Sequence, residues 1–391
     1  MSRVHTEKGV EWGITESILA PVITQHVAEK RFPESVSIPG LDLGGELQVT
    51  YTLDDELQHE ATRLLRKHRP DYGVLVAIDP DNGHILAMSD NTRSGTNHGN
   101  LATRNTFPAA SISKIITAVA ALEENKANAR TVIPFNGKAT SLYKKNVFNH
   151  KNNKWTRKLT LTESFGKSVN SVFGRLGAVT LGGKTMREYA YRLGFDGQFA
   201  SDLSFGNGSI DLDVEDRWQV AEMASGYTRR NTLSPLHAAT LAATAINGGD
   251  LVAPVIVEAM TGPFGVPVYS HQQPARSEAM SESTSSQLRT LMEQTVSDGS
   301  ARKSFRRFNR GDYKSVTVGG KTGSLTGHQP PGKYDWFVGY AYRGDKKIAF
   351  AALCINKEKW YVKSARLARE LLEFYFSGDR DQQTPEIAAA L

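Results

Sequence analysis

The positions of strand-like segments along the 391 residues constrain the fold more than any other feature of this sequence. Apolar runs bounded by turn residues predict strands near both ends of the chain. Residues from about 130 to 300 instead show helical spacing and almost no strand pattern. Because strands need partners, the two ends are expected to build one sheet together. The middle is then expected to be a helical region inserted into that sheet.

The predicted elements follow this division. Asp81-Asn-Gly83 separates two apolar runs and predicts a hairpin over 74–88, because Asn and Gly tolerate the positive φ of tight turns. Further strands are predicted at 47–52, 315–324, 336–342 and 347–355. Helices are predicted at 54–67, 111–124, 161–176, 185–193, 217–227, 235–246 and 364–376, and another begins at the cluster 281–286.

Composition excludes several classes of protein. With 39% hydrophobic and 23% charged residues, the chain is neither disordered, collagen-like nor membrane-embedded. Its net charge of +6 permits an anionic partner without requiring one. No apolar run reaches about 18 residues and the first 30 residues lack a signal-peptide pattern, so no membrane crossing is predicted. Cys354 is the single cysteine and lies in an apolar run, which excludes an intrachain disulfide and predicts a buried, unreactive thiol.

Turn-forming residues suggest how the chain is divided. Pro39-Gly40 and Gly44-Gly45 set residues 1–45 apart as an N-terminal arm or linker. Residues 46–380 are expected to form one domain, with its sheet part at about 46–125 and 300–376 and its helical part at about 126–299. Residues 381–391 are expected to be a C-terminal tail.

The first motif that suggests chemistry is Ser111-Ile-Ser-Lys114. At positions i and i+3 of a helix the two side chains share a face, so the amine can accept the proton of the hydroxyl. The same spacing begins at Ser141, Ser164 and Ser300, and a capping serine with a solvated lysine explains any single match. Only Ser111 opens a strongly apolar helix, whose positive dipole end favours a serine oxyanion and a neutral lysine. Ser141 and Ser300 lie in basic, loop-like sequence.

The second motif, Ser168-Val-Asn170, lies inside the helix predicted at 161–176. Its hydroxyl and amide would point to one side of a turn. There the hydroxyl could relay a proton and the amide could hold a peptide group of a substrate. Ser89-Asp-Asn91 matches the same pattern, but it follows the predicted hairpin, where a turn is the simpler explanation.

The third motif, Lys321-Thr-Gly323, occurs once and lies in a predicted strand. A phosphate-binding loop would need a further glycine five residues before Gly320, and that position is Ser315. Lysine and threonine on an exposed strand suit a carboxylate, since one supplies charge and the other a hydroxyl donor. The flanking glycines would let a substrate backbone lie close.

Together, in this order, the three motifs are typical of the penicillin-recognising serine enzymes. From about Leu47 to Tyr375 the chain resembles the transpeptidase domain of penicillin-binding proteins, and the segments 52–58, 76–88, 233–249 and 335–341 add to the likeness. The resemblance implies an α+β fold. Its five-stranded antiparallel sheet is flanked by helices and carries an inserted all-helical subdomain, which agrees with the predicted element order.

The resemblance also implies a mechanism. Ser111 would attack the penultimate D-alanine of a peptidoglycan stem peptide, and the amine of a neighbouring stem would resolve the acyl-serine into a cross-link. A β-lactam would mimic the peptide and trap the ester. Lys114 would take the serine proton, helped by burial beside Lys321, which lowers its pKa. The backbone N–H groups of Ser111 and Ser324 would form the oxyanion hole.

The remaining motif residues receive roles in the same way. Ser168 would pass the proton to the leaving amine, and Asn170 would hold the stem-peptide amide. Lys321 and Thr322 would bind the terminal carboxylate, with Gly323 beside them. The implied partners are peptidoglycan stem peptides, β-lactam antibiotics and cell-wall assembly proteins, with no nucleic acid, metal or cofactor. The implied location is the periplasm or the outer face of the cytoplasmic membrane, although the sequence shows neither an export signal nor an anchor.

Several alternatives stay open. A D,D-carboxypeptidase or a serine β-lactamase would share the acylation step and differ in the acceptor. A class A β-lactamase would need a glutamate in a Glu-x-x-Leu-Asn context after the second motif, and Glu188, Glu215 and Glu222 lack that context. A non-catalytic β-lactam- or peptide-binding module would not need all three motifs intact. Because residues 1–45 are too short for a glycosyltransferase domain, we expect a single-function transpeptidase or an excised domain.

A nucleic-acid binder is a further alternative, from a different class. The stretches 143–158 and 302–310 interleave basic and aromatic residues, which can grip phosphates and stack on bases, although such runs are more often solvated loops. For metal, His59-Glu60 lacks the second histidine of a zinc motif, so no metal site is proposed.

Overall fold

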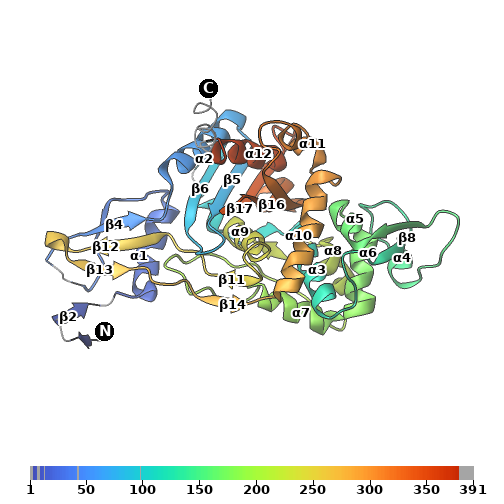
Figure 1. Ribbon diagram of the computed structural model, residues 1–391, viewed down its shortest axis with the longest axis horizontal. Coiled ribbons are helices and arrows are strands. Elements are labelled where there is room, and N and C mark those ends of the chain that lie inside the picture. Colours follow the sequence, from blue (N-terminus) through green and yellow to red (C-terminus); the bar gives the residue numbers. More distant parts are fainter. Residues whose placement is uncertain (1–2, 7–8, 13, 42–43, 97, 378–391) are drawn as a thin grey trace, which may run out of the picture.

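A computed structural model describes residues 3–6, 9–12, 14–41, 44–96 and 98–377 of the chain (Figure 1). Its centre is a five-stranded antiparallel sheet that joins strands from both ends of the sequence, which confirms the predicted fold class. In spatial order the strands are β15 (Thr317–His328), β16 (Pro331–Arg343), β17 (Lys346–Asn356), β5 (Tyr72–Ile78) and β6 (Ile85–Thr92).

Helices cover one face of this sheet with an apolar layer. Successive side chains of a strand point to opposite faces, so Phe337 and Phe350 join this layer while Trp336 and Val338 face the other side. Cys354 is fully buried here, as its apolar run predicted. Burial raises the pKa of its thiol to about 12. The covering helices are α2 (Asp55–His68), α11 (Arg302–Phe305) and α12 (Ser364–Tyr375).

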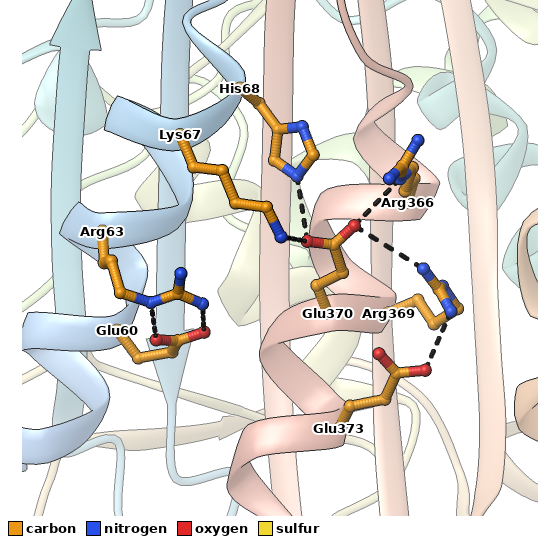
Figure 2. Close-up of polar contacts among 8 residues, drawn as sticks. All are labelled: Glu60, Arg63, Lys67, His68, Arg366, Arg369, Glu370 and Glu373. Atoms are coloured by element: carbon orange, nitrogen blue, oxygen red, sulfur yellow. Dashed lines mark hydrogen bonds and ion pairs between the residues drawn. The ribbon is translucent and has the colours of Figure 1, made fainter.

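A cluster of charged side chains joins α2 to α12 on this face (Figure 2). Lys67 and His68 of α2 contact the Glu370 carboxylate at 3.0 and 2.9 Å, and Arg366 donates to it at 2.9 Å. Burial alone would raise the pKa of Glu370, but the hydrogen bonds from His68, Arg366 and Lys67 lower it to about 2. Glu370 therefore stays ionised and links the two helices.

The opposite face carries the larger apolar core. Every residue of α9 (Pro235–Thr244) is buried there, and Ser234 caps its first turn by accepting from the His237 backbone N–H. α3 (Lys114–Glu123) is also buried over almost its whole length. α10 (Glu282–Ser297) begins at Ser281, as predicted, and buries Leu288 and Leu291 in the same core.

The helical part lies beside and below α10 and α3 and extends to the right of Figure 1. The single helix predicted at 161–176 is wrong. A capping box between Thr160 and Glu163 starts a short helix that ends at Gly166, and Ser168 has a φ of 55°, which breaks the helical path before Asn170 starts the next helix. The helices of this part are α4 (Lys144–Phe148), α5 (Leu161–Gly166), α6 (Asn170–Arg175), α7 (Gly183–Arg192) and α8 (Arg217–Ser225).

Short strands also occur in the region where almost none were predicted. Each has two to five residues, which is too few to show an alternating pattern in the sequence. They include the pairs β8 (Val132–Phe135) with β9 (Arg157–Thr160), β7 (Phe107–Pro108) with β10 (Thr232–Leu233), and β11 (Asp250–Val252) with β14 (Arg276–Glu278). A separate four-stranded sheet has the order β13 (Pro267–Ser270), β12 (Val257–Thr261), β4 (Leu47–Tyr51) and β3 (Ser35–Val36).

The N-terminal region packs against the domain through α1 (Glu16–Ala28), which buries Leu19, Ile23 and Val27 in the larger core. Before it, β1 (Arg3–Thr6) pairs with β2 (Gly9–Trp12). The tail predicted at 381–391 lies outside the described residues. Within the ranges that the structure describes, no helix combines the length and apolar character that crossing a bilayer requires.

Candidate active site

Ser111 lies in a tight turn between β7 and α3. The predicted helix 111–124 begins as a 3₁₀ turn over Ala110–Ser113, and the α-helix proper starts at Lys114. Gly226, directly after α8, lies against this turn with a φ of +67°. A Cβ atom at Gly226 would lie 1.8 Å from the carbonyl oxygen of Ala110 and 2.8 Å from the backbone nitrogen of Ser111. Only glycine therefore allows the end of α8 to approach this closely.

Lys114 connects three segments of the chain. Its Nζ atom hydrogen-bonds to Ser111 Oγ at 2.8 Å, to Asn170 Oδ1 at 2.8 Å and to the backbone carbonyl of Ser225. The side chain is completely buried. Burial, together with the positive charge of nearby Lys321, lowers the pKa of Lys114 well below its ordinary value. The lysine therefore has both the contact and the pKa direction that proton transfer from Ser111 requires.

Lys321 makes a second buried amine beside the first. Its Nζ atom donates to Ser168 Oγ at 2.9 Å and to the backbone carbonyl of Thr322 at 2.9 Å. Burial lowers the pKa of Lys321 to about 7. The left-handed backbone of Ser168, which interrupted the predicted helix, turns this hydroxyl toward β15 and leaves it partly exposed.

Two packed aromatic rings lie beneath the two amines. Phe165 and Phe173 contact each other with their ring centres 5.9 Å apart. Lys321 Nζ lies 5.4 Å from the Phe165 ring centre, and Lys114 Nζ lies 5.8 Å from that of Phe173. The rings exclude water from the amines, and this desolvation lowers the pKa of both lysines. The negative faces of the rings partly offset the effect, because they attract the charged form of an amine.

Asn170 is held by both ends of its amide. Oδ1 accepts from Lys114, and Nδ2 donates to the carbonyl of Thr140 at 2.9 Å. Because one end must accept and the other must donate, these contacts fix the orientation of the amide. Asn170 therefore stands between the Ser111–Lys114 pair and the loop that precedes α4.

β15 brings the third motif to the Ser111 turn. It is an edge strand, hydrogen-bonded within its sheet to β16 alone, so its other edge can receive an extended peptide. A Cβ atom at Gly323 would lie 3.3 Å from Ile112 and 3.4 Å from the carbonyl of Ala109, so glycine lets the strand pass close to the Ser111 turn. Trp336 Nε1 donates to the carbonyl of Pro108 at 3.0 Å and ties β16 to the same turn.

The Thr322 hydroxyl faces a segment that the sequence did not assign to the site. Thr322 Oγ1 lies 2.5 Å from Ser300 Oγ, just before α11. Ser324 is exposed, with its Oγ 3.5 Å from Asp335 Oδ1. Ser300 therefore stands beside a predicted substrate-binding residue.

The four Ser-x-x-Lys matches differ clearly in the structure. Ser111 contacts the lysine of its own motif, whereas Ser300 contacts Thr322 and Ser141 donates to the carbonyl of Lys138. Ser164 is completely buried, and its hydroxyl finds no partner among the described residues. The sequence missed Gly226, the Ser225 carbonyl and the position of Ser300. Only Ser300 left a signal in the sequence, as an unused motif match.

Comparisons with known proteins place the chain in a family. The family model described as "Penicillin binding protein transpeptidase domain" matches residues 73–373. Stage V sporulation protein D of Bacillus subtilis is 28% identical over 333 residues, which cover 79% of this chain and 49% of that protein. Peptidoglycan D,D-transpeptidase PbpA of Mycobacterium tuberculosis is 26% identical over 322 residues, which cover 73% and 62%. The chain thus spans about half to three-fifths of the length of these relatives.

Solved structures share the fold. The D,D-transpeptidase domain of a peptidoglycan glycosyltransferase from Eggerthella lenta superposes with a TM-score of 0.69 at 22% identity, covering 88% of this chain and 90% of that one. Penicillin-binding protein 3 from Mycobacterium tuberculosis, complexed with aztreonam, gives a TM-score of 0.73 at 17% identity, covering 87% and 80%.

Proposed function

Since the chain belongs to the penicillin-binding protein transpeptidase domain family, we propose that it is a peptidoglycan D,D-transpeptidase that acts through an acyl-serine at Ser111. The observation that carries the proposal is the 2.8 Å contact between Ser111 Oγ and a completely buried Lys114 with a lowered pKa. The relatives support it, because PbpA of Mycobacterium tuberculosis is named a peptidoglycan D,D-transpeptidase. Solved structures of penicillin-binding protein A from the same organism include acyl-enzyme complexes with imipenem and penicillin G.

The three contacts of Lys114 suit a neutral amine. Asn170 Oδ1 and the Ser225 carbonyl can only accept hydrogen bonds, so they take the two protons that a neutral amine carries. The nitrogen lone pair is then directed at the Ser111 hydroxyl, as a general base requires. Lys114 takes the proton as Ser111 Oγ attacks the carbonyl carbon of the penultimate D-alanine. The oxyanion that forms is held by the N–H groups of Ser111 and Ser324.

The second pair returns a proton to the leaving group. Ser168 donates its hydroxyl proton to the amine of the departing D-alanine and is resupplied from Lys321, which hydrogen-bonds to it at 2.9 Å. With a pKa of about 7, Lys321 changes protonation readily at neutral pH. Lys114 thus takes the proton of the attacking serine, and Lys321 supplies the proton that reaches the leaving amine.

The terminal carboxylate of the donor peptide binds along β15. Thr322 supplies a hydroxyl donor, positioned by Ser300 at 2.5 Å, and Lys321 supplies charge. An arriving anion favours the charged form of Lys321, because a nearby opposite charge raises the pKa of an amine. Asn170 holds the peptide amide with the second hydrogen of its Nδ2 group, since the Thr140 carbonyl takes only one. Gly323 keeps the strand close enough for these contacts.

The side-chain contacts of the site argue against a class A β-lactamase. Among the described residues, no carboxylate hydrogen-bonds to the side chains of Ser111, Lys114, Ser168, Asn170 or Lys321. A class A β-lactamase uses a glutamate to activate the water that hydrolyses the acyl-serine. The name of the relative PbpA favours transpeptidation over D,D-carboxypeptidase activity, which differs in the acceptor.

The partners and the location follow from this chemistry. Stem peptides are the donor and acceptor, β-lactams are inhibitors, and cell-wall assembly proteins are expected to guide the enzyme. Because the substrate is peptidoglycan, the domain is proposed to act in the periplasm or at the outer face of the cytoplasmic membrane.

Mass spectrometry of a reaction with a donor pentapeptide and an amine acceptor tests the proposal. Release of D-alanine with formation of the cross-linked product is expected. A product that is only trimmed by one D-alanine would identify a carboxypeptidase instead.

A further inference from the structure

A large groove lies on the α11–α12 side of the sheet, on the face opposite the larger core. We call it the basic groove. It encloses about 1110 Å³ between residues 303–311 and residues 360–369. Its lining includes Lys303, Arg306, Arg307 and Arg310 from the first segment, and Lys363, Arg366 and Arg369 from the second. No described carboxylate lines it, and none of the proposed catalytic or substrate-binding residues belongs to it.

The two segments differ in how their charges are balanced. Lys363 lies 3.6 Å from Asp335, while Arg366 and Arg369 pair with Glu370 and Glu373 at 2.9 and 2.8 Å, as Figure 2 shows for the two arginines. These pairs hold the α12 side of the groove in place.

The charges of the first segment are exposed and uncompensated. Lys303, Arg306, Arg307 and Arg310 make no ion pair with any residue that the structure describes, and all four are exposed. Four positive charges on one wall of a concave surface create a strong positive electrostatic potential, which attracts anions.

The aromatic residues of this segment decide what kind of anion it can take. Phe305 and Phe308 are completely buried and pack against each other and against Phe337 and Tyr313. They cannot stack on nucleic-acid bases. The hypothesis that 302–310 binds nucleic acid therefore loses its base-stacking component. Trp360, at the other wall, is 39% exposed, and Lys363 lies 3.3 Å above its ring centre. What remains is a positively charged surface that suits anionic groups.

We propose that the basic groove binds a ligand that carries several phosphate groups. The planar fork of an arginine side chain matches two phosphate oxygens at once, and three of the four uncompensated cations are arginines. The volume of about 1110 Å³ is far larger than one phosphate, so a ligand with neighbouring phosphates uses more of the wall. Because none of the proposed catalytic or substrate-binding residues lines the groove, the proposed binding does not use the acyl-transfer residues.

Calorimetric titration of the full chain with inorganic tripolyphosphate at low salt tests the proposal. The variant Arg306→Gln/Arg307→Gln/Arg310→Gln removes three exposed side chains without touching the core. We expect its affinity for tripolyphosphate to fall by at least about tenfold, because three charge-assisted contacts to phosphate are lost together. Its melting temperature and its labelling by fluorescent penicillin should equal those of the unmodified chain, which shows that the variant is folded.

A matched control separates the groove from net charge. Lys151→Gln/Lys154→Gln/Lys158→Gln removes the same three charges from the exposed part of the other basic stretch. Its affinity should stay within about twofold of the unmodified chain. An equal loss in the control, no binding by the unmodified chain, or tighter binding of a glutamate peptide of the same charge than of tripolyphosphate would each overturn the proposal.

Vesicles identify the source of the phosphate. Co-sedimentation with phosphatidylglycerol vesicles that is lost in the arginine variant, with none on phosphatidylcholine alone, would assign the groove to a lipid headgroup. Arginine-dependent binding of tripolyphosphate without vesicle binding would assign it to a soluble phosphate compound. Both results support the proposal, whereas vesicle binding that is unchanged in the arginine variant would contradict it.

Discussion

Lys114 Nζ lies 2.8 Å from Ser111 Oγ, while the carbonyl of Ser225 and the side-chain oxygen of Asn170 occupy its other contacts. Three segments distant in the sequence therefore determine the direction in which one amine can accept a proton. This arrangement explains how an ordinary serine could become a nucleophile in a domain for which no metal is proposed.

Replacing Lys114 by methionine should remove acylation while keeping the fold. Methionine fills most of the same volume but cannot take a proton, so the second-order rate constant for penicillin labelling should fall by about 10²–10⁴-fold. Stopped-time labelling measures the rate, and circular dichroism monitors the fold. A folded variant that is labelled at the original rate would exclude Lys114 as the base.

The acylation rate should depend on pH through both lysines. The pKa of Lys114 is lowered by burial and by Lys321, so the rate should rise with pH as Lys114 loses its proton, well before an ordinary lysine would. It should fall again as Lys321, with a pKa of about 7 before an anion binds, loses the charge that holds the carboxylate. In Lys321→Arg the alkaline decline should move to higher pH because arginine stays protonated, while the maximal rate should fall because arginine cannot resupply the proton of Ser168. A rate that does not change between pH 5 and 9 would contradict these assignments.

Gly226→Ala should disturb the Ser111 turn. The new Cβ atom would lie 1.8 Å from the Ala110 carbonyl, at a φ of +67°. Labelling should slow by at least about tenfold, and the free energy of unfolding should fall by more than the roughly 1 kcal/mol of the backbone strain alone. Gly248→Ala is the control, because Gly248 has a φ of +93° and no atom within 4 Å of the new Cβ. It should lose stability only and keep its labelling rate.

Ser300→Ala tests whether Ser300 positions Thr322. Loss of one hydrogen bond at 2.5 Å should reduce the labelling efficiency by about 3–10-fold, mainly through weaker binding, with the maximal acylation rate nearly unchanged. Ser297→Ala is a suitable control, since Ser297 is exposed and donates to the Glu293 carbonyl within α10. Equal effects of the two substitutions would show that Ser300 has no special role.

The link between α2 and α12 predicts a pH-dependent stability. The pKa of Glu370 falls to about 2 in the folded chain, so its contribution is fully present above the unfolded pKa of about 4.3 and is lost as pH falls toward 2. Glu370→Gln should cost about 1–2 kcal/mol at pH 7, after allowance for solvent screening, and the difference should shrink below pH 4. Urea unfolding at several pH values measures it. Glu373→Gln, at a site whose pKa is raised by burial, should show no such acid-dependent loss.

Sequence patterns predicted the central sheet and placed the three motifs, because long strands and buried helices have strong periodicity. They could not predict the left-handed Ser168, which depends on how α5 and α6 pack, and so one continuous helix was expected there. The pairing of β4 with β12 was missed because it joins segments about 200 residues apart. Ser300 and Gly226 were missed for a related reason, since each reaches the site through contacts with a distant segment.

The most direct test of the central claim is covalent labelling by fluorescent penicillin, followed by peptide mapping of the labelled residue. The unmodified chain should take up one label per molecule at Ser111, and Ser111→Ala should take up none. Ser164→Ala should be labelled normally, because Ser164 has the same spacing to a lysine but is completely buried. Stoichiometric labelling that persists in folded Ser111→Ala, or that maps to another serine, would contradict the account.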